Sequence, residues 1–504
     1  MKPVVRAGAV AFIASFCTLV LELVAGRVLA PYVGVSLYTW TSIIGVVLAG
    51  ISCGAWAGGR LADRRPAAST LSWLLFASGL AALLIAPATS MLAGDDGLLT
   101  TARIAMTLLA RVIVLSVLLF FVPSFLLGMI SPVAVKFAVR DMATAGSVVG
   151  KIYAISTLGS IAGTFTTGFY LVARFGTRAT ILGVGITLIA SALLMVSRRA
   201  GGAAILAAIA IVALWPHAPL PPQQRARWAS KETGIIHQEE SQYYAIQVHR
   251  TVRADTGAPI HALHLDRLVH SYADLADPAF FEYGYLHLFE ALIDRDDRRL
   301  LFIGGGGYTL PRKIEQERRD VEIDVVEIDP AVTRVAQRFF GVERRTRIRT
   351  RNEDARWFAM HGRGPYDVIF VDAFNDLSVP YHLTTREYTE RLRTMLVPDG
   401  ILAANVVDDF EHGRFLASYV RTLQAVFGEE KVTLAMEDAQ ATSRPRATFV
   451  VIASRRPIAA PPHALTPVAL RDYLVRREAI ILTDDFAPVD QMLAPIFAAR
   501  ALDE

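Results

Sequence analysis

The chain has 504 residues, enough for two or three domains, and 53% of them are hydrophobic while only 19% are charged. Soluble domains of ordinary composition carry about 25% charged residues, so this composition argues against an entirely soluble protein. The formal net charge of +4 is small for this length, and no stripe of Lys and Arg alternates with aromatic residues, so nucleic acid is not expected as a partner.

The first 215 residues form a series of apolar runs, and about 20 apolar residues are enough to cross the hydrocarbon core of a bilayer. We therefore expect an N-terminal all-α polytopic membrane domain over residues 1–215. Both cysteines, Cys17 and Cys53, lie inside apolar runs and indicate neither a disulfide framework nor a metal site. The expected spans are Ala7–Val24, Leu37–Ala57, Thr70–Leu92, Ile104–Leu127, Gly150–Val172 and Ala179–Val196, with Gly202–Trp215 as a short seventh run.

Two features of this half extend beyond simple spans. Apolar sequence continues after the fourth run as Val133–Val139, past two prolines, and we expect an interfacial helix there. Glu22, Arg27 and Arg111 lie at or inside the span limits, where charge is costly and often functional. They form either a functional site or pairs between helices and contacts with the interface.

The basic residues near the span ends indicate the orientation of the chain. Most of them fall on one side if the spans alternate from the first, and the positive-inside rule then puts the N-terminus in the cytoplasm. Six spans would return the C-terminal half to the cytoplasm, whereas seven would place it outside. Hydropathy alone leaves this choice open.

A Pro-rich linker over residues 216–230 separates the apolar half from a charged sequence typical of a globular domain. In "LLFIGGGGYTLPRK" a short buried strand, Leu300–Ile303, ends in a glycine turn that leads into a helix. A second apolar strand follows and ends at Glu327, 21 residues after Gly306. Glycines let the backbone approach a nucleotide, and an acid at the tip of the second strand accepts ribose hydroxyls, so this unit predicts a nucleoside site.

Further strands end in acidic residues as well. "RIRTRNEDARWF" gives a strand leading to Asp354, "YDVIFVDAF" one ending at Asp372, and "GILAANVV" another after a helix over Thr385–Leu396. Strands that alternate with helices predict a parallel sheet covered on both faces. The acids at the carboxyl ends of these strands would then lie in one crevice.

These motifs together resemble the spermidine synthase family of aminopropyltransferases: the glycine loop, "VVEIDP", "EDA", "YDVIFVDAF" and "LTTREYTERLRTMLVPDGIL". The membrane half is similar to that of the family's membrane-fused members through "AGRVLAPYVGVS", "LGMISPVAVK" and "GKIYAISTLGSIAGTFTTGF". The resemblance implies a C-terminal α/β Rossmann-like domain of the S-adenosylmethionine (AdoMet) methyltransferase type over residues 276–504. A small β-domain over residues 231–275 would precede it.

The resemblance also implies roles for individual residues. Asp372 would be the catalytic acid, which attracts a cationic amine and takes its proton. Glu327 would hold the ribose hydroxyls, and Asp354 and Ala355 would meet the adenine. Gly304, Gly305 and Gly306 would pass beneath the nucleoside, and substrate contacts are expected from Gln242, His270, Tyr283, Asp376 and Asp485.

The chain departs from the family where the amine is bound. Gly307 and Tyr308 stand where the family carries an acid after the third glycine, and Asn375 stands at the second acid, beside Asp376. The family's tyrosine falls on Phe281. Asp484, Asp485 and Asp490 line either the path of a cationic acceptor or a solvated turn, and His261, His264 and His270 are expected at strand and loop positions without a metal.

Three functions follow from these observations. The first is a membrane-anchored aminopropyltransferase that uses decarboxylated AdoMet and an amine such as putrescine, and releases methylthioadenosine. The others are a methyl- or alkyltransferase that uses AdoMet on a membrane substrate, and a non-enzymatic polyamine sensor or carrier. We favour the first, with a multi-pass chain in the inner cell membrane, a homodimer as one possible assembly, and the soluble half in the cytoplasm, where the donor is made.

Overall fold

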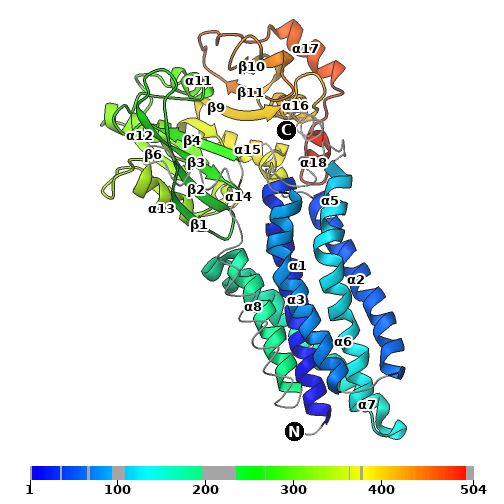
Figure 1. Cartoon of the computed structure of the whole chain (residues 1–504). Helices are drawn as coiled ribbons and strands as arrows, with labels where there is room; N and C mark the ends of the chain where they lie inside the picture. The colour runs from blue at the N-terminus through cyan, green and yellow to red at the C-terminus, as the bar shows by residue number, and fades with distance from the viewer. Residues whose placement is uncertain are drawn as a thin grey trace. The chain divides into compact units, whose positions relative to one another are not determined.

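The computed structural model describes residues 3–33, 37–64, 68–93, 108–195, 234–266, 268–362, 364–374 and 379–494. They form two compact units, one helical and one built from two β-sheets with helices (Figure 1). The expected linker at 216–230 and the short run Gly202–Trp215 lie outside the described residues.

The helical unit contains six helices that are long and apolar enough to cross a membrane, counted over the described residues. Each of the six expected spans overlaps one of them. The segments are α1 (Pro3–Val33), α2 (Leu37–Arg64), α3 (Ala68–Ala93), α5 (Leu108–Ser116), η1 (Val117–Phe121), α6 (Val122–Ala138), η2 (Met142–Thr144), α7 (Ala145–Thr166), η3 (Thr167–Leu171) and α8 (Val172–Met195).

The prediction of a separate interfacial helix at Val133–Val139 is wrong. Helix α6 continues without a break through Pro132 to Ala138, and Val133 is fully buried among other apolar side chains. Pro123 directly follows the π-helical turn η1, where the regular pattern of backbone hydrogen bonds is already interrupted, so its missing N–H and its ring are tolerated inside the continuous helix. The fourth span is therefore one helical path from Leu108 to Ala138.

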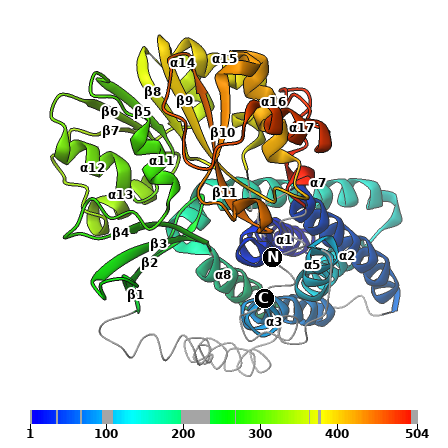
Figure 2. The same ribbon diagram turned by 90° about the horizontal axis from the view of Figure 1, so that it is seen from above.

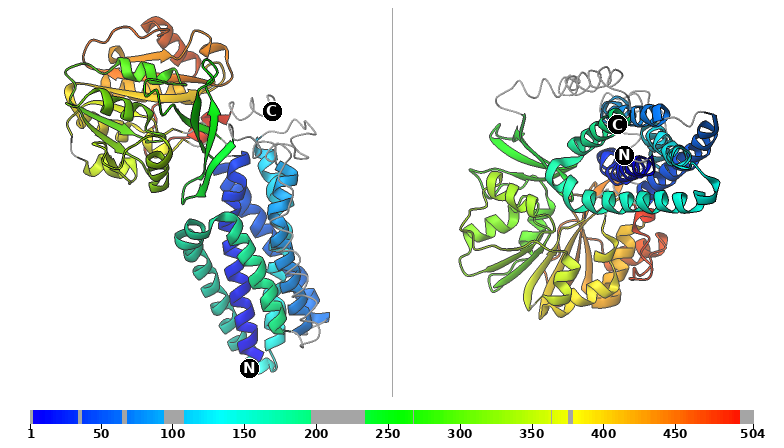
Figure 3. Two further views of the ribbon diagram at one scale, coloured as in Figure 1. Left: turned by 60° about the vertical axis from the view of Figure 1, so that its left-hand side comes forward. Right: turned by 90° about the horizontal axis from the view of Figure 1, so that it is seen from below.

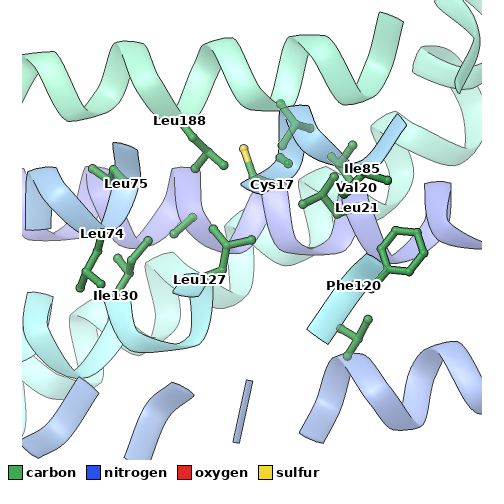
Figure 4. Close-up of a cluster of buried hydrophobic side chains, with 14 of the residues drawn as sticks. Cys17, Val20, Leu21, Leu74, Leu75, Ile85, Phe120, Leu127, Ile130 and Leu188 are labelled. Carbon is green, nitrogen blue, oxygen red and sulfur yellow. The ribbon is translucent and has the colours of Figure 1, made fainter. Parts of the chain in front are cut away.

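Helix α1 lies at the centre of the helical unit, in contact with α2, α3, α5, α6, α7 and α8, as the views along the helices show (Figures 2 and 3). Cys17 and Leu21 of α1 pack in its apolar core with Leu127 and Leu188 (Figure 4). A Cβ at Gly159 of α7 would lie 2.3 Å from a backbone oxygen of α1, so a glycine lets these two helices approach closely.

The other unit contains a small four-stranded sheet of order β1-β2-β3-β4. Strands β2 and β3 are antiparallel, as are β3 and β4. Buried residues alternate with more exposed ones along β2 and, on either side of the irregularity between Leu263 and His264, along β3, so one face packs on the protein. The strands are β1 (Gly234–Glu240), β2 (Ala245–Val252), β3 (Pro259–Leu265) and β4 (Leu268–Ala273).

The larger sheet has seven strands in the order β10-β11-β9-β8-β5-β6-β7. Its apolar runs are buried on both faces, as in "VIFV" of β8, which is typical of a sheet covered by helices on each side. The strands are β5 (Arg299–Ile303), β6 (Glu322–Val326), β7 (Arg349–Arg351), β8 (Tyr366–Val371), β9 (Leu396–Asp408), β10 (Val432–Met436) and β11 (Ala447–Ser454).

The Rossmann-like class is confirmed, but the sheet is mixed rather than wholly parallel. Strands β5 to β9 are parallel, whereas β10 and β11 pair antiparallel with each other, and β11 pairs antiparallel with β9. Around the sheet lie α11 (Tyr285–Ala291), α12 (Thr309–Glu317), α13 (Pro330–Phe339), α14 (Ala355–His361), α15 (Arg386–Thr394), α16 (Phe415–Phe427), α17 (Pro467–Arg476), α18 (Val489–Met492) and the short turns Tyr381–Leu383, Glu429–Lys431 and Ala441–Ser443. The parallel strands end at one rim, which positions the site.

Candidate active site

A cavity of about 310 Å³ lies at the rim where β5, β6, β8 and β9 end. Strand β4 and the turn between β1 and β2 contribute to its lining. Nine of the residues singled out in the sequence line it, namely Gly304, Gly305, Gly306, Glu327, Asp354, Ala355, Asp372, His270 and Tyr283. The structure therefore brings most of the predicted site residues together.

The glycine turn between β5 and α12 adopts backbone conformations that other residues disfavour. Gly304 has a φ of +99° and Gly306 a φ of +48°. A Cβ on Gly304 would lie 2.2 Å from the carbonyl oxygen of Asp372, so the turn and the end of β8 approach within contact distance. Ser271 of β4 accepts a hydrogen bond from the Gly307 amide at 2.9 Å, which joins the small sheet to the turn.

Glu327 follows β6 and faces the same turn. Its Oε2 accepts hydrogen bonds from the amides of Gly305 at 2.8 Å and Gly306 at 3.4 Å, and its Oε1 accepts one from the Asp329 amide at 2.9 Å. Burial raises the pKa of Glu327, although the three amide donors oppose this rise. The carboxylate thus lies beside the glycine turn, within reach of a ligand in the cavity.

Asp354 forms the N-cap of α14. Its Oδ1 accepts from the amides of Arg356 and Trp357, each at 2.9 Å, and its Oδ2 lies 3.2 Å from Nε2 of His382. The cap directs Asp354 and the following Ala355 to the cavity, next to the end of β6. A polar edge of a base could be bound at this position.

Asp372, directly after β8, is held by two neutral donors. The Tyr285 hydroxyl donates to its Oδ2 at 2.8 Å, and Nδ2 of Asn405 donates to its Oδ1 at 2.9 Å. Burial of the carboxyl group raises the pKa of Asp372, while the two hydrogen bonds act in the opposite direction. A carboxylate fixed in this way can accept a proton from a ligand in the cavity.

Three of the expected substrate contacts are not found in the lining. Gln242 is exposed and lies outside the cavity, whereas the next two residues in the chain, Tyr243 and Tyr244, line it. Asp485 is exposed in the turn between Thr483 and Phe486, which is the solvated-turn alternative, and Asp484 forms an ion pair with Arg356. Asp376 lies outside the described residues.

The histidines of the small sheet make contacts within the protein. His261 Nδ1 lies 2.6 Å from the backbone oxygen of Phe339, and the ring of His264 stacks on that of His249. Within the described residues, no group of three or more His, Cys, Asp and Glu is placed to hold a metal ion.

Sequence reasoning missed Asn405, Ser271 and Arg446, and it gave Tyr285 no role. Asn405 follows the apolar part of β9 at the same rim as Asp372, so its place at a strand end was a signal that could have been used. Phe281, the expected aromatic position, is buried outside the cavity lining. Tyr285 instead reaches the central carboxylate.

Comparison with known proteins identifies the family. The sequence profile of the spermine/spermidine synthase domain matches residues 285–441. The polyamine aminopropyltransferase of Vibrio vulnificus is 31% identical over 209 residues, which cover 39% of this chain and 67% of that protein. The chain belongs to the spermidine synthase family.

Two further relatives each match 51% of the chain. Polyamine aminopropyltransferase 1 of Streptomyces coelicolor is 28% identical over 276 residues, which cover 51% of each protein, so the chain spans about half the length of that relative. The crystal structure of a probable spermidine synthase from Corynebacterium glutamicum has a TM-score of 0.43 and 21% identity, and covers 51% of this chain and 99% of that one.

One departure from the spermidine synthase pattern has a structural explanation. Tyr308, where an acid was expected near the glycine turn, is buried with a φ of +57°. Its hydroxyl lies 3.1 Å from Oγ1 of Thr333 and 3.3 Å from Oγ1 of Thr350, and burial raises its pKa to about 12. Tyr308 therefore stabilises the turn through these contacts with α13 and β7, and no carboxylate at this position is available for an amine.

Proposed function

We propose that this protein is a membrane-anchored aminopropyltransferase, which transfers an aminopropyl group from decarboxylated AdoMet to an amine and releases methylthioadenosine. The observation that carries the proposal is the position of Asp372. It lies between Tyr285 and Asn405 in the cavity, beside the glycine turn and Glu327. Membership of the spermidine synthase family supports the same activity.

Each part of the cavity has a role in this reaction. Glu327 would accept hydrogen bonds from the ribose hydroxyls, and Asp354 with Ala355 would contact the adenine. Gly304, Gly305 and Gly306 would pass beneath the nucleoside. His270 and Tyr283 would contact the transferred chain or the acceptor.

The chemistry requires a neutral amine at the reacting carbon. A new C–N bond forms as the C–S bond breaks, and the electron pair of that bond goes to sulfur, so methylthioadenosine leaves as a neutral molecule. The proton of the attacking amine passes to the carboxylate of Asp372. Binding both substrates in one cavity supplies the rest of the rate acceleration, because it aligns the attacking nitrogen with the reacting carbon.

We further propose that six spans anchor the protein in the inner cell membrane, with the second unit in the cytoplasm. Six long apolar helices and the distribution of basic residues favour this arrangement.

The test uses the purified full-length chain in detergent with decarboxylated AdoMet and putrescine. We expect release of methylthioadenosine, and we expect Asp372→Asn to lower kcat by about 10²–10⁴-fold because it removes the proton acceptor. Release of S-adenosylhomocysteine from AdoMet, with none of methylthioadenosine, would instead identify a methyltransferase. Tyr308 is buried where the family carries an acid that contacts the amine, and the loss of this contact is the observation that favours the second function.

A further inference from the structure

The cavity has two sides of different charge, which meet at Asp372. Strand β8, which precedes Asp372, lies between β5 and β9 in the sheet. On the β5–β6 side the lining contains the carboxylates of Glu327, Glu353 and Asp354. On the β9–β11 side the lining contains residues of both strands and Arg446, which directly precedes β11. Among these described residues, Arg446 carries the charged side chain.

Arg446 reaches this rim because of the direction of β11. The strand runs antiparallel to β9, with Thr448 opposite Val407 and Val450 opposite Asn405. The start of β11 therefore lies at the rim where the parallel strands end. A cation at this point is unexpected beside a site for diamines, because a second ammonium group would be repelled by it.

Two buried polar atoms in the cavity have no hydrogen-bond partner among the described residues. They are Oδ1 of Asn405 and Nε2 of His270. Because Nδ2 of Asn405 donates to Asp372, its Oδ1 faces away from that bond and can only accept, which suits an N–H group of a ligand. Burial and the nearby Arg446 lower the pKa of His270 to about 4, so a neutral imidazole can donate from Nε2 to an anionic group.

We propose that the substrate bound between Asp372 and Arg446 is an amino carboxylate. Asp372 and Oδ1 of Asn405 bind its amino group, while Arg446 and His270 bind its carboxylate. The inference rests on the proposed function and narrows its substrate class. The carboxylate belongs either to an amino acid that serves as acceptor or to the tail of intact AdoMet that serves as donor.

The reaction balances in both cases. The acceptor nitrogen forms a bond to the carbon next to the sulfonium, the C–S bond breaks with its electron pair going to sulfur, and the proton goes to Asp372. Methylthioadenosine is released whether the transferred chain is aminopropyl or aminocarboxypropyl, so one product measures both.

The experiment compares acceptors that differ by a single carboxylate: ornithine against putrescine, and lysine against cadaverine. Methylthioadenosine release by the full-length protein is followed with decarboxylated AdoMet. We expect kcat/KM to be at least about tenfold higher for ornithine or lysine than for its diamine, because a charged hydrogen bond is gained. Arg446→Gln should lower that ratio toward one, whereas Arg444→Gln, a nearby exposed Arg paired with Asp438, should not change it.

A second arm assigns the carboxylate to its source. If putrescine reacts faster with intact AdoMet than with the decarboxylated form, and Arg446→Gln removes this preference, the carboxylate belongs to the donor. The inference is overturned if putrescine with decarboxylated AdoMet is the best pair and Arg446→Gln changes all acceptors by the same factor.

Failure of the proposed function would be recognised separately. If no combination releases methylthioadenosine, the aminopropyltransferase proposal fails, and binding of ornithine and AdoMet to the full-length protein is then measured by calorimetry. Weaker binding of either ligand to Arg446→Gln than to the unaltered protein and to Arg444→Gln would still support the carboxylate site. Equal binding to all three proteins would overturn it.

Discussion

At the scale of single residues, the central carboxylate has two neutral donors and no cationic partner within the contacts described for it. Tyr285 and Asn405 each stabilise the ionised form of Asp372, and burial opposes them. A base with a raised pKa is protonated over a wider range of acidic pH than an ordinary Asp. Activity should therefore fall as the pH is lowered through that raised pKa.

Tyr285→Phe tests this balance. Loss of the hydroxyl removes a donor that lowers the pKa of Asp372, so the pKa should rise further and the acidic limb of kcat/KM should move to higher pH. The profile is measured from pH 5 to 9 with one acceptor, so that the titration of the acceptor cancels. Tyr366→Phe is the matched control, because its hydroxyl also donates to a carboxylate, that of Asp324, but lies outside the cavity lining. An acidic limb at the same pH in Tyr285→Phe and the unaltered protein would contradict the prediction.

The residues of the site differ in how far sequence could predict them. Glu327, Asp354 and Asp372 were found because parallel strands end at one rim, so a strand-end acid is placed by topology alone. The contacts of Asp372 were not found, because Asn405 and Tyr285 lie 33 and 87 residues away and meet it only through packing. Gln242 was expected in the lining, but the turn after β1 presents Tyr243 and Tyr244 there.

At the scale of elements, the turn between β5 and α12 contacts both Glu327 and Asp372 and so fixes the distance between them. Gly304→Ala would place a methyl group against the carbonyl oxygen of Asp372 and would also strain the backbone, since the φ of +99° suits glycine. We expect loss of about 1–3 kcal/mol of folding stability from strain alone, with a further loss of activity as the end of β8 shifts.

A matched control separates strain from displacement. Gly428 has a φ of +100° and no atom within 4 Å of a Cβ built on it. Gly428→Ala should lower the thermal unfolding midpoint while kcat/KM stays near that of the unaltered protein. Gly304→Ala should lower both the midpoint and kcat/KM. If kcat/KM fell equally in the two variants, the contact with Asp372 would not be the cause.

The elements themselves were predicted well where periodicity and glycine are informative. The β5–turn–α12–β6 unit and the helix α15 follow the sequence closely, because an apolar run, a turn and a capping residue act locally. The antiparallel pair β10 and β11 and the π-helical turns η1 and η3 were not expected. Strand direction depends on which edge of the sheet is free, and a π turn depends on packing around it, so neither is encoded by a local pattern.

At the scale of the whole molecule, the chain combines a helical unit with apolar exterior and a globular unit with a polar cavity. Leu48, Trp73 and Phe169 are 53%, 70% and 72% exposed, respectively, on long helices. Contact of such apolar side chains with lipid is favourable, whereas their exposure to water is unfavourable. We expect the chain to stay in the membrane fraction after washing at alkaline pH and to be released by detergent.

Fractionation of cells that express the full chain measures this directly. A peripheral protein run in parallel should leave the membrane in the same wash, and release of this chain with it would contradict six spans. Tags at the two termini should be accessible from the same side of the membrane if six spans are present, because an even number of crossings returns the chain to its starting side. Tags accessible from opposite sides would indicate an odd number of spans.

The two sides of the cavity that meet at Asp372 depend on different stretches of chain. The side that contains Glu327 comes from the β5–α12–β6 unit, in which the amides of the glycine turn donate to Glu327 and little change is tolerated. Arg446, by contrast, lies in the exposed connection before β11, outside any packed element. We therefore expect mutations in that connection to change which carboxylate-bearing substrate is used while the β5–α12–β6 unit keeps its structure. Substrate preference could then change in evolution while Asp372 and its two donors stay the same.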